Sequence, residues 1–411
     1  MNLSNLLTLR YDPTLGLPNP GIRVITPKEI LQNRKSLSKE EKENKSYRNI
    51  EVELREVIRA ELEALSVKRI SVALSAGIDS NVIFSLVRRE FPHIDINCIT
   101  VSFNDDLREV RDTKEIAESQ NAAFHSINVQ NPLTDLPMLL NIIKEPRWNI
   151  YQYYFIKKAR SISNILFTGD GGDELFAGYT FRYKKFLENN HTNSSWLDKV
   201  RLYLMCHERD WVPDQKDMFG TKIKFRWSSV YQLLRKYFDN KLNPLEQVLL
   251  ADYHGKLMYD FIPTNYKYFE YFGIKGISPL LSSNVINLSA KIPAYQKYNL
   301  VENLGKIPLH RILKDNMPSL YSLTERRRKM GFGMDLVKLW FEEGKEIVMT
   351  HLDKGIILEE KIIDREWYNK ALSHIHDRKD PRYISKMLQL LSLEVWYKLF
   401  ITHEMNPTSS L

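Results

Sequence analysis

The sequence is poor in cysteine, in long apolar runs and in any large excess of one charge. Its 411 residues include two cysteines, Cys98 and Cys206, and no Cys-x-x-Cys pair, which argues against a disulfide framework and a thiolate metal site. No apolar run approaches the ~18 residues that a membrane span needs, and the N-terminus does not resemble a signal peptide. The net charge of +8 combines 59 basic with 51 acidic residues, a mixture that does not favour nucleic acid. We therefore expect a cytoplasmic protein without a membrane or nucleic-acid partner.

The length and composition predict more than one structural unit. A chain with 43% apolar residues can bury a sizeable core, but 411 residues are many for a single core. Turn-forming residues are concentrated in residues 1–32, where we expect no regular element. We predict three parts: an N-terminal segment and linker over residues 1–49, an α/β nucleotide-binding core over 50–190, and a mainly helical part over 191–411 that completes the active site.

A loop of small residues follows the first predicted strand, residues 70–74, and precedes an amphipathic helix. The loop reads Ser75-Ala76-Gly77-Ile78-Asp79-Ser80. Backbone N–H groups and the helix dipole would bind an anion such as phosphate there, and Asp79 suits a divalent cation that bridges carboxylate and phosphate. The loop is not a Walker A motif, because no lysine follows Gly77 at the required place. An ordinary strand-to-helix turn is the alternative interpretation.

Further predicted strands alternate with helices along the next hundred residues. The strands are expected at 96–103, 124–129 and 164–168, with helices over 105–120 and 148–160. This order favours a parallel sheet with right-handed crossovers, in which ligands bind beyond the carboxyl ends of the strands. His125 has no visible partner, so we interpret it as structural.

The last of these strands ends in an acidic, glycine-rich stretch. It reads Gly169-Asp170-Gly171-Gly172-Asp173-Glu174. Three acids in five positions repel one another unless a cation lies among them. We interpret Asp173 as a ligand that shares one magnesium ion with Asp79 and with phosphate oxygens. A flexible acidic turn that caps the next helix is the alternative.

These two loops, in this order, resemble those of the asparagine synthetase family, whose synthetase domain is a PP-loop ATP pyrophosphatase with an adenine nucleotide α-hydrolase-like fold. Residues 75–80 are similar to its Ser-Gly-Gly-x-Asp-Ser loop, with Ala76 in place of the first glycine. Residues 327–332 resemble its Arg-x-Lys-x-Gly-Phe motif, and residues 390–400 its terminal helix. Lys306 matches the first residue of its Lys-x-x-Leu-Arg segment, where His310 replaces the arginine. The resemblance runs from about residue 50 to the C-terminus.

The resemblance implies an enzyme that uses ATP and Mg²⁺ to adenylate a carboxylate, releases pyrophosphate, and transfers ammonia or an amine to the acyl group. It implies an adenosine and α-phosphate site at Leu74, Val101, Thr168 and Gly169. The loop Ser75, Ala76, Gly77, Ile78, Asp79 and Ser80 would hold pyrophosphate, and Asp79 and Asp173 would hold magnesium. Asp170 would be the acid/base and Lys329 would lie beside the phosphates, with Lys275, Lys306 and Arg327 as candidate contacts of substrate or pyrophosphate.

Two departures from the family's pattern bear on the substrates. The chain begins Met1-Asn2 and has no cysteine before residue 50, so we expect no N-terminal glutaminase domain. Free ammonia, an amine on a substrate or a separate glutaminase subunit would then supply nitrogen. The family's Glu-x-Arg-x-Pro-Phe-Leu-Asp segment has lost its Glu and Arg here, where it begins at Lys275. We therefore expect a small-molecule or peptide carboxylate other than aspartate, with an acidic group near Lys275.

Two alternatives remain from the sequence. The aromatic run over residues 266–272 would serve as a stacking platform for a base, although a helix that packs its rings into the core explains it better. The chain would also fit a nucleotide-binding subunit with weak catalysis that serves a partner enzyme.

Overall fold

A five-stranded parallel sheet organises the α/β part of the protein in this computed structural model, which describes residues 1–15, 21–35, 46–65, 67–103, 107–207, 211–325 and 334–411. The strands are β1 (Arg69–Ala73), β2 (Asp95–Phe103), β3 (Ala123–Val129), β4 (Ile165–Phe167) and β5 (Lys275–Ile277). They pair in the order β3-β2-β1-β4-β5. The first four confirm the predicted strands, whereas β5 was not predicted and comes from a much later part of the chain.

In the described residues, nine helical segments precede or surround the first four strands. They are α1 (Leu3–Leu9), the 3-10 turn η1 (Pro13–Leu15), α2 (Pro27–Lys35), α4 (Ser46–Leu65), α5 (Ile78–Glu90), α6 (Leu107–Ser119), α7 (Leu136–Ile143), α8 (Gln152–Arg160) and α9 (Gly172–Phe176). The helix predicted from residue 50 and the helix after the small-residue loop are thus present as α4 and α5.

The remainder of the described chain is mainly helical. Its elements are α10 (Thr180–Asn189), α11 (Trp196–Met205), α12 (Trp227–Phe238), α13 (Pro244–Asp252), the π-helix η2 (Tyr253–Phe261), α14 (Ile262–Phe272), η3 (Pro279–Leu281), α15 (Ser283–Lys291), α16 (Ala294–Lys297), α17 (Ile307–Asn316), α18 (Pro318–Glu325), α19 (Leu336–Leu339), the π-helix η4 (Trp340–Gly344), α20 (Lys345–Leu352), α21 (Ile356–Glu359), α22 (Arg365–Arg378) and α23 (Pro381–Phe400). Tyr268 of α14 is fully buried, which fits the core-packing interpretation of the aromatic run.

The strand order fixes where a ligand would bind. The chain runs outward from β1 through β2 to β3, and then returns to place β4 on the other side of β1. Right-handed crossovers therefore put α5 and α6 on one face of the sheet and α8 on the other. The reversal on either side of β1 makes a topological switch point at the carboxyl end of this strand, where ligands of open α/β sheets bind.

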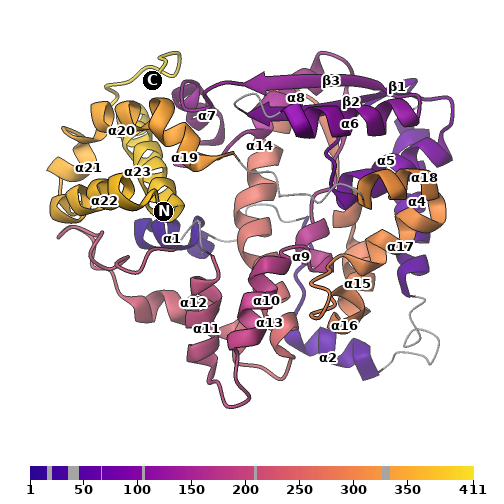
Figure 1. Cartoon of the computed structure of the whole chain (residues 1–411), viewed down its shortest axis with the longest axis horizontal. Coiled ribbons are helices and arrows are strands. Elements are labelled where there is room, and N and C mark those ends of the chain that lie inside the picture. The colour runs from indigo at the N-terminus through magenta and orange to yellow at the C-terminus, as the bar shows by residue number, and fades with distance from the viewer. Residues whose placement is uncertain (16–20, 36–45, 66, 104–106, 208–210, 326–333) are drawn as a thin grey trace.

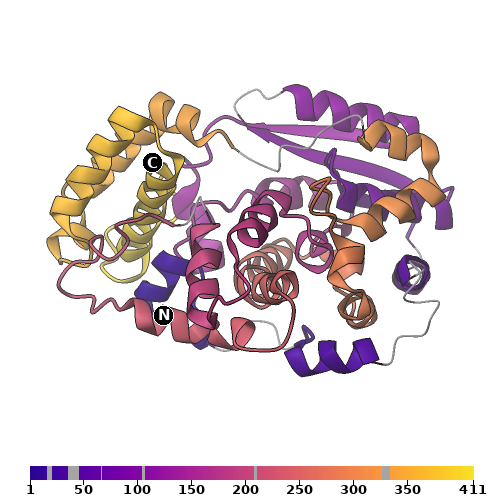
Figure 2. The same cartoon turned by 60° about the horizontal axis from the view of Figure 1, so that its bottom comes forward.

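The expectation that residues 1–32 carry no regular element was wrong. The Asn2 side chain caps α1 by accepting a hydrogen bond from the Asn5 N–H at 3.2 Å, and Leu6 and Leu7 are buried. Pro27 begins α2. The helix α1 lies beside the C-terminal helices (Figures 1 and 2), where Lys386 of α23 donates to the Leu7 carbonyl. Helix formation here depends on a partner far along the chain, which local composition does not reveal.

No helix in the described ranges is long and apolar enough to cross a membrane.

Candidate active site

The predicted phosphate loop lies between the end of β1 and the first turn of α5. The Ser80 hydroxyl accepts a hydrogen bond from the Ser75 N–H at 3.1 Å. The Asn81 amide donates to the carbonyls of Ser75 and Gly77, at 2.9 and 2.7 Å. Gly77 is the N-cap of α5 and makes no side-chain cap. Because the first N–H groups of a helix lack partners within the helix, the loop presents the donors of Ile78, Asp79 and Ser80.

The alanine in place of the family's first glycine causes no backbone strain. Ala76 is not among the residues with positive φ, and Gly77 has φ −80°. Next to the loop, the Leu74 N–H donates to the Ile99 carbonyl at 2.9 Å, so β1 stays paired with β2 as far as its end, while β2 continues to Phe103. Val101 is buried in β2. Of the residues expected around adenosine, Leu74 and Val101 thus lie on the β1–β2 side of the site, whereas Thr168 and Gly169 follow β4 on the other side of β1.

Glycines let the acidic stretch after β4 approach the phosphate loop closely. A Cβ atom at Gly169 would lie 2.8 Å from the Ser80 nitrogen, and one at Gly172 would lie 2.4 Å from Asp79 Cγ. Gly171 has φ +91° and starts α9 in the left-handed region that favours glycine. Larger residues at these positions would push the two loops apart. The two stretches identified in the sequence therefore meet at the switch point.

Lys306 joins the two predicted metal ligands. Its Nζ lies 2.5 Å from Asp79 Oδ2 and 2.7 Å from Asp173 Oδ1. Burial by itself would lower the pKa of Lys306, but the charges of Asp173 and Asp79 outweigh burial and raise this pKa above its ordinary value. Lys306 is the N-cap of α17 in a left-handed conformation, with φ 54°, and its N–H donates to the Phe176 carbonyl at 2.7 Å. The ammonium is thus fixed between the two loops.

Asp170 is the third acid of the site. Its Oδ2 accepts hydrogen bonds from the Thr168 hydroxyl at 2.7 Å and the Asn265 amide at 2.8 Å. The Ser278 hydroxyl lies 2.7 Å from the Thr168 hydroxyl. Burial raises the pKa of Asp170 above its ordinary value in spite of these hydrogen bonds. A carboxyl group with a raised pKa is a stronger base when ionised, which suits proton transfer.

The residues present fit a magnesium ion that is shared with a nucleotide. The carboxylates of Asp79 and Asp173 lie close enough together to contact one cationic group, the ammonium of Lys306. Mg²⁺ commonly uses one or two carboxylates together with substrate phosphates. In the described ranges there is no group of three or more His, Cys, Asp or Glu side chains that could hold a metal. The donor set therefore suits a metal that arrives with phosphate oxygens rather than an all-protein metal site.

The structure does not bring Lys275 to this site. Lys275 starts β5, opposite Ile165 at the start of β4, and it forms an ion pair with Glu61 at 2.5 Å. It therefore lies at the amino end of the sheet, whereas Asp170 and Asp173 follow its carboxyl end. The expectation of an acidic substrate group beside Lys275 loses its basis. Arg327 and Lys329 lie outside the described residues.

His310 does not replace the charge of the family's arginine. Burial lowers the pKa of His310 to about 4, and the charge of Lys306 contributes to this decrease. The imidazole is therefore neutral near pH 7. Its Nδ1 is buried and has no hydrogen-bond partner within the described ranges.

Sequence reasoning missed two residues that hold the site together. Asn265 stands immediately before the aromatic run over 266–272, and nothing local connects it with Asp170. Ser278 lies in the divergent segment that begins at Lys275, at a position that the family's pattern leaves unspecified. Both act through contacts between elements far apart in the chain, so single-sequence patterns carry no signal for them. The hydrogen bond from Asn265 to Asp170 joins residues 95 positions apart.

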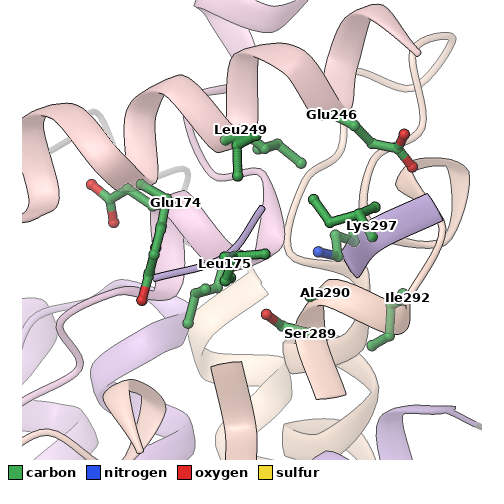
Figure 3. A pocket seen from close by; sticks show the side chains of 12 residues that line it. Glu174, Leu175, Glu246, Leu249, Ser289, Ala290, Ile292 and Lys297 are labelled. Carbon is green, nitrogen blue, oxygen red and sulfur yellow. The ribbon is translucent and has the colours of Figure 1, made fainter. Parts of the chain in front are cut away.

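A small cavity beside α9 is lined by Glu174, Leu175, Leu249, Ser289 and Lys297 among others (Figure 3). The Glu174 carboxyl accepts a hydrogen bond from the Tyr179 hydroxyl at 2.7 Å. Burial first, and then the charge of Asp173, raise the pKa of Glu174 to about 8. Glu174 thus lines the cavity as a buried acid whose surroundings favour its neutral form.

Neither cysteine is placed for nucleophilic catalysis. Cys98 and Cys206 are both buried, and neither forms a disulfide. Burial raises the pKa of Cys98 well above its ordinary value, which keeps it a neutral thiol. His125 is hydrogen-bonded to Asn97 at 3.0 Å, as a structural histidine would be.

Comparison with known proteins agrees with this geometry. The family model described as asparagine synthase matches residues 49–398. Over 185 residues the chain is 29% identical to asparagine synthetase [glutamine-hydrolyzing] 1 of Bacillus subtilis (strain 168). That match covers 41% of this chain and 29% of the relative, so the chain spans less than a third of the relative's length. The family model includes the phosphate loop, the acidic stretch and Lys306.

Proposed function

The chain belongs to the asparagine synthase family, and on that premise we propose that it is an ATP-dependent, AMP-forming ligase that adenylates a carboxylate and transfers ammonia or an amine to it. One observation carries the proposal. Two carboxylates from separate loops, Asp79 and Asp173, both form ion pairs with the buried ammonium of Lys306, next to the N-terminus of α5. Such a site suits a triphosphate with its metal, because it pairs anion donors with ligands for a hard cation.

The residues of the site suit the first half of this reaction. A carboxylate is a poor acceptor for an amine because oxide is a poor leaving group, whereas AMP leaves readily from an acyl-adenylate. The N–H groups of Ile78 to Ser80 and the ammonium of Lys306 would stabilise the negative charge that develops on departing pyrophosphate. Magnesium held by Asp79 and Asp173 would supply further positive charge to the phosphates.

Asp170 suits the second half of the reaction, in which the amine attacks the acyl-adenylate. An attacking amine must lose a proton as it forms the amide, and the carboxylate of Asp170 would take that proton, a role typically worth roughly 10²- to 10⁴-fold in rate. Thr168 and Asn265 fix the Oδ2 atom of this carboxylate. Both cysteines are buried, so we propose that the nitrogen comes from ammonia, from a substrate amine or from a separate glutaminase subunit.

The test is a screen of carboxylic acids with ATP, Mg²⁺ and ammonium. We expect AMP and pyrophosphate in equal amounts, and only when an acceptable acid is present. ADP and phosphate as products would contradict the proposal. With a productive acid in hand, glutamine in place of ammonium should give no amide, and an amide formed together with an equal amount of glutamate would refute our view of the nitrogen source.

A further inference from the structure

A carboxylate that belongs to none of the recognised motifs touches the phosphate loop. Glu109 lies in the first turn of α6, and its Oε1 accepts a hydrogen bond from the Ala76 N–H at 2.9 Å. The residue is partly exposed at the edge of the sheet. Its other oxygen, Oε2, has no hydrogen-bond partner in the part of the chain that the structure describes. Glu109 is therefore a positioned acceptor with one oxygen still available.

The strand order shows which part of a nucleotide this acceptor would face. Asp173 follows β4, and Lys306 links it with Asp79, so the phosphate and metal end of the site lies on the β4 side of β1. Helix α6 follows β2, which the strand order places on the opposite side of β1 from β4, and α6 lies beside β2 (Figure 1). Glu109 thus lies on the same side as Val101, over the ends of β1 and β2. A nucleotide with its phosphates at Lys306 would place its nucleoside there.

The chemistry of Glu109 favours the sugar over the phosphates. A carboxylate that faced a phosphate would repel it, whereas the two hydroxyls of ribose are hydrogen-bond donors that a carboxylate accepts well. The N–H of Ala76 is occupied by Glu109, and the loop still offers the donors of the α5 first turn for pyrophosphate. The Ala76 N–H would thus orient the Glu109 carboxylate, while the other N–H groups of the loop would bind phosphate.

We propose that Glu109 accepts a hydrogen bond from a ribose hydroxyl of ATP and so determines the preference of this enzyme for ribonucleotides. The Ala76 N–H orients the carboxylate for this contact. The proposal rests on the proposed function, because it requires ATP at this edge of the sheet.

The experiment compares the binding of ATP, 2′-deoxy-ATP, 3′-deoxy-ATP and pyrophosphate, each with Mg²⁺, to the full-length protein by titration calorimetry. In the wild-type protein, the analogue that lacks the contacted hydroxyl should bind about tenfold more weakly than ATP, because a hydrogen bond to a charged group is lost. In Glu109→Ala, ATP should bind as weakly as that analogue. The affinity for pyrophosphate should stay within about twofold.

Two further variants separate the contact from effects on the loop. Glu109→Gln keeps an oxygen for the Ala76 N–H but loses the charge, so the preference for ATP should fall to about two- to threefold. Glu118→Gln is the matched control, because Glu118 is an exposed residue of the same helix whose ion pair with Lys114 spans 3.7 Å, and it should bind all four ligands like the wild type.

Other outcomes would overturn the inference in distinguishable ways. Wild-type protein that binds both deoxy analogues as well as ATP would show that no ribose hydroxyl is read. Tighter binding of ATP and pyrophosphate alike in Glu109→Ala would identify Glu109 as a competitor for the phosphate position instead. A wild-type protein that binds neither ATP nor pyrophosphate would contradict the proposed function, and this inference with it.

Discussion

At the residue scale, the site depends on pairing two carboxylates, the buried Asp79 and the half-buried Asp173, with the buried ammonium of Lys306. We predict that Asp79→Asn and Asp173→Asn each lower the magnesium-dependent rate by at least about 10²-fold, because each removes a charged ligand beside the phosphates. Asp377→Asn changes an exposed aspartate far from these contacts and should keep the wild-type rate. The measurement is pyrophosphate release at several magnesium concentrations. Near-normal rates in either site variant at ordinary magnesium would show that the two acids do not share an ion.

A glycine beside these charges provides a second test at the same scale. A Cβ atom at Gly178 would lie 1.9 Å from Asp173 Oδ1 and 2.1 Å from Lys306 Cε. Gly178→Ala should therefore displace the ion pair and lower the rate by at least about tenfold. Gly273→Asn is the control, because Gly273 has φ +60° with open space around it and asparagine tolerates that conformation. Equal activity of Gly178→Ala and the wild type would mean that the loops move apart without consequence.

At the scale of elements, a buried histidine connects the N-terminal segment with η2. The Nε2 of His254 accepts a hydrogen bond from the Ile25 N–H at 3.2 Å, and its Nδ1 donates to the Leu250 carbonyl at 3.1 Å. Burial lowers the pKa of His254 from 6.5 to about 4. The folded state therefore binds fewer protons than the unfolded state between these values. The stabilisation is complete above pH 6.5 and is lost as the pH falls towards 4.

This linkage gives a measurable pH dependence. Between pH 7 and pH 5, His254 should cost the wild type about 2 kcal/mol of unfolding free energy, at about 1.4 kcal/mol per pH unit below 6.5. His254→Gln keeps a neutral acceptor and donor, so its unfolding free energy should fall by correspondingly less over the same range. Urea unfolding of both proteins at the two pH values measures the difference. Parallel pH profiles would contradict a depressed pKa at His254.

The elements also show which parts of the fold can be predicted from the sequence. The first four strands, α4 and α5 follow from local periodicity, because buried strands such as β1 and the amphipathic α4 have patterns of their own. The loops at 75–80 and 169–174 could be placed together, since both follow strands that end at one edge. β5 is three residues long and has no pattern of its own. The roles of Lys306, Asn265 and Glu109 come from contacts that only the tertiary fold creates.

At the scale of the whole molecule, the first and last helices are packed together. Lys386 and Gln389 of α23 donate to the carbonyls of Leu7 and Leu6, and Leu7 is fully buried. Leu7→Ala should lower the unfolding free energy by roughly 2–5 kcal/mol, because it opens a cavity in this contact. Leu15→Ala, at an exposed leucine, should change it by less than about 0.5 kcal/mol. Thermal and urea unfolding of the two variants test this, and similar losses in both would argue against a packed α1.

The same contact has a consequence for biosynthesis. The hydrogen bond from Gln389 to Leu6 joins residues 383 positions apart. On the ribosome, α1 leaves the exit tunnel long before α23 is synthesised, and in that interval its apolar side stays exposed to chaperones and proteases. Asp79 and Asp173 likewise emerge before Lys306. A nascent chain would thus carry an uncompensated pair of acids until Lys306 has been synthesised and has folded between them.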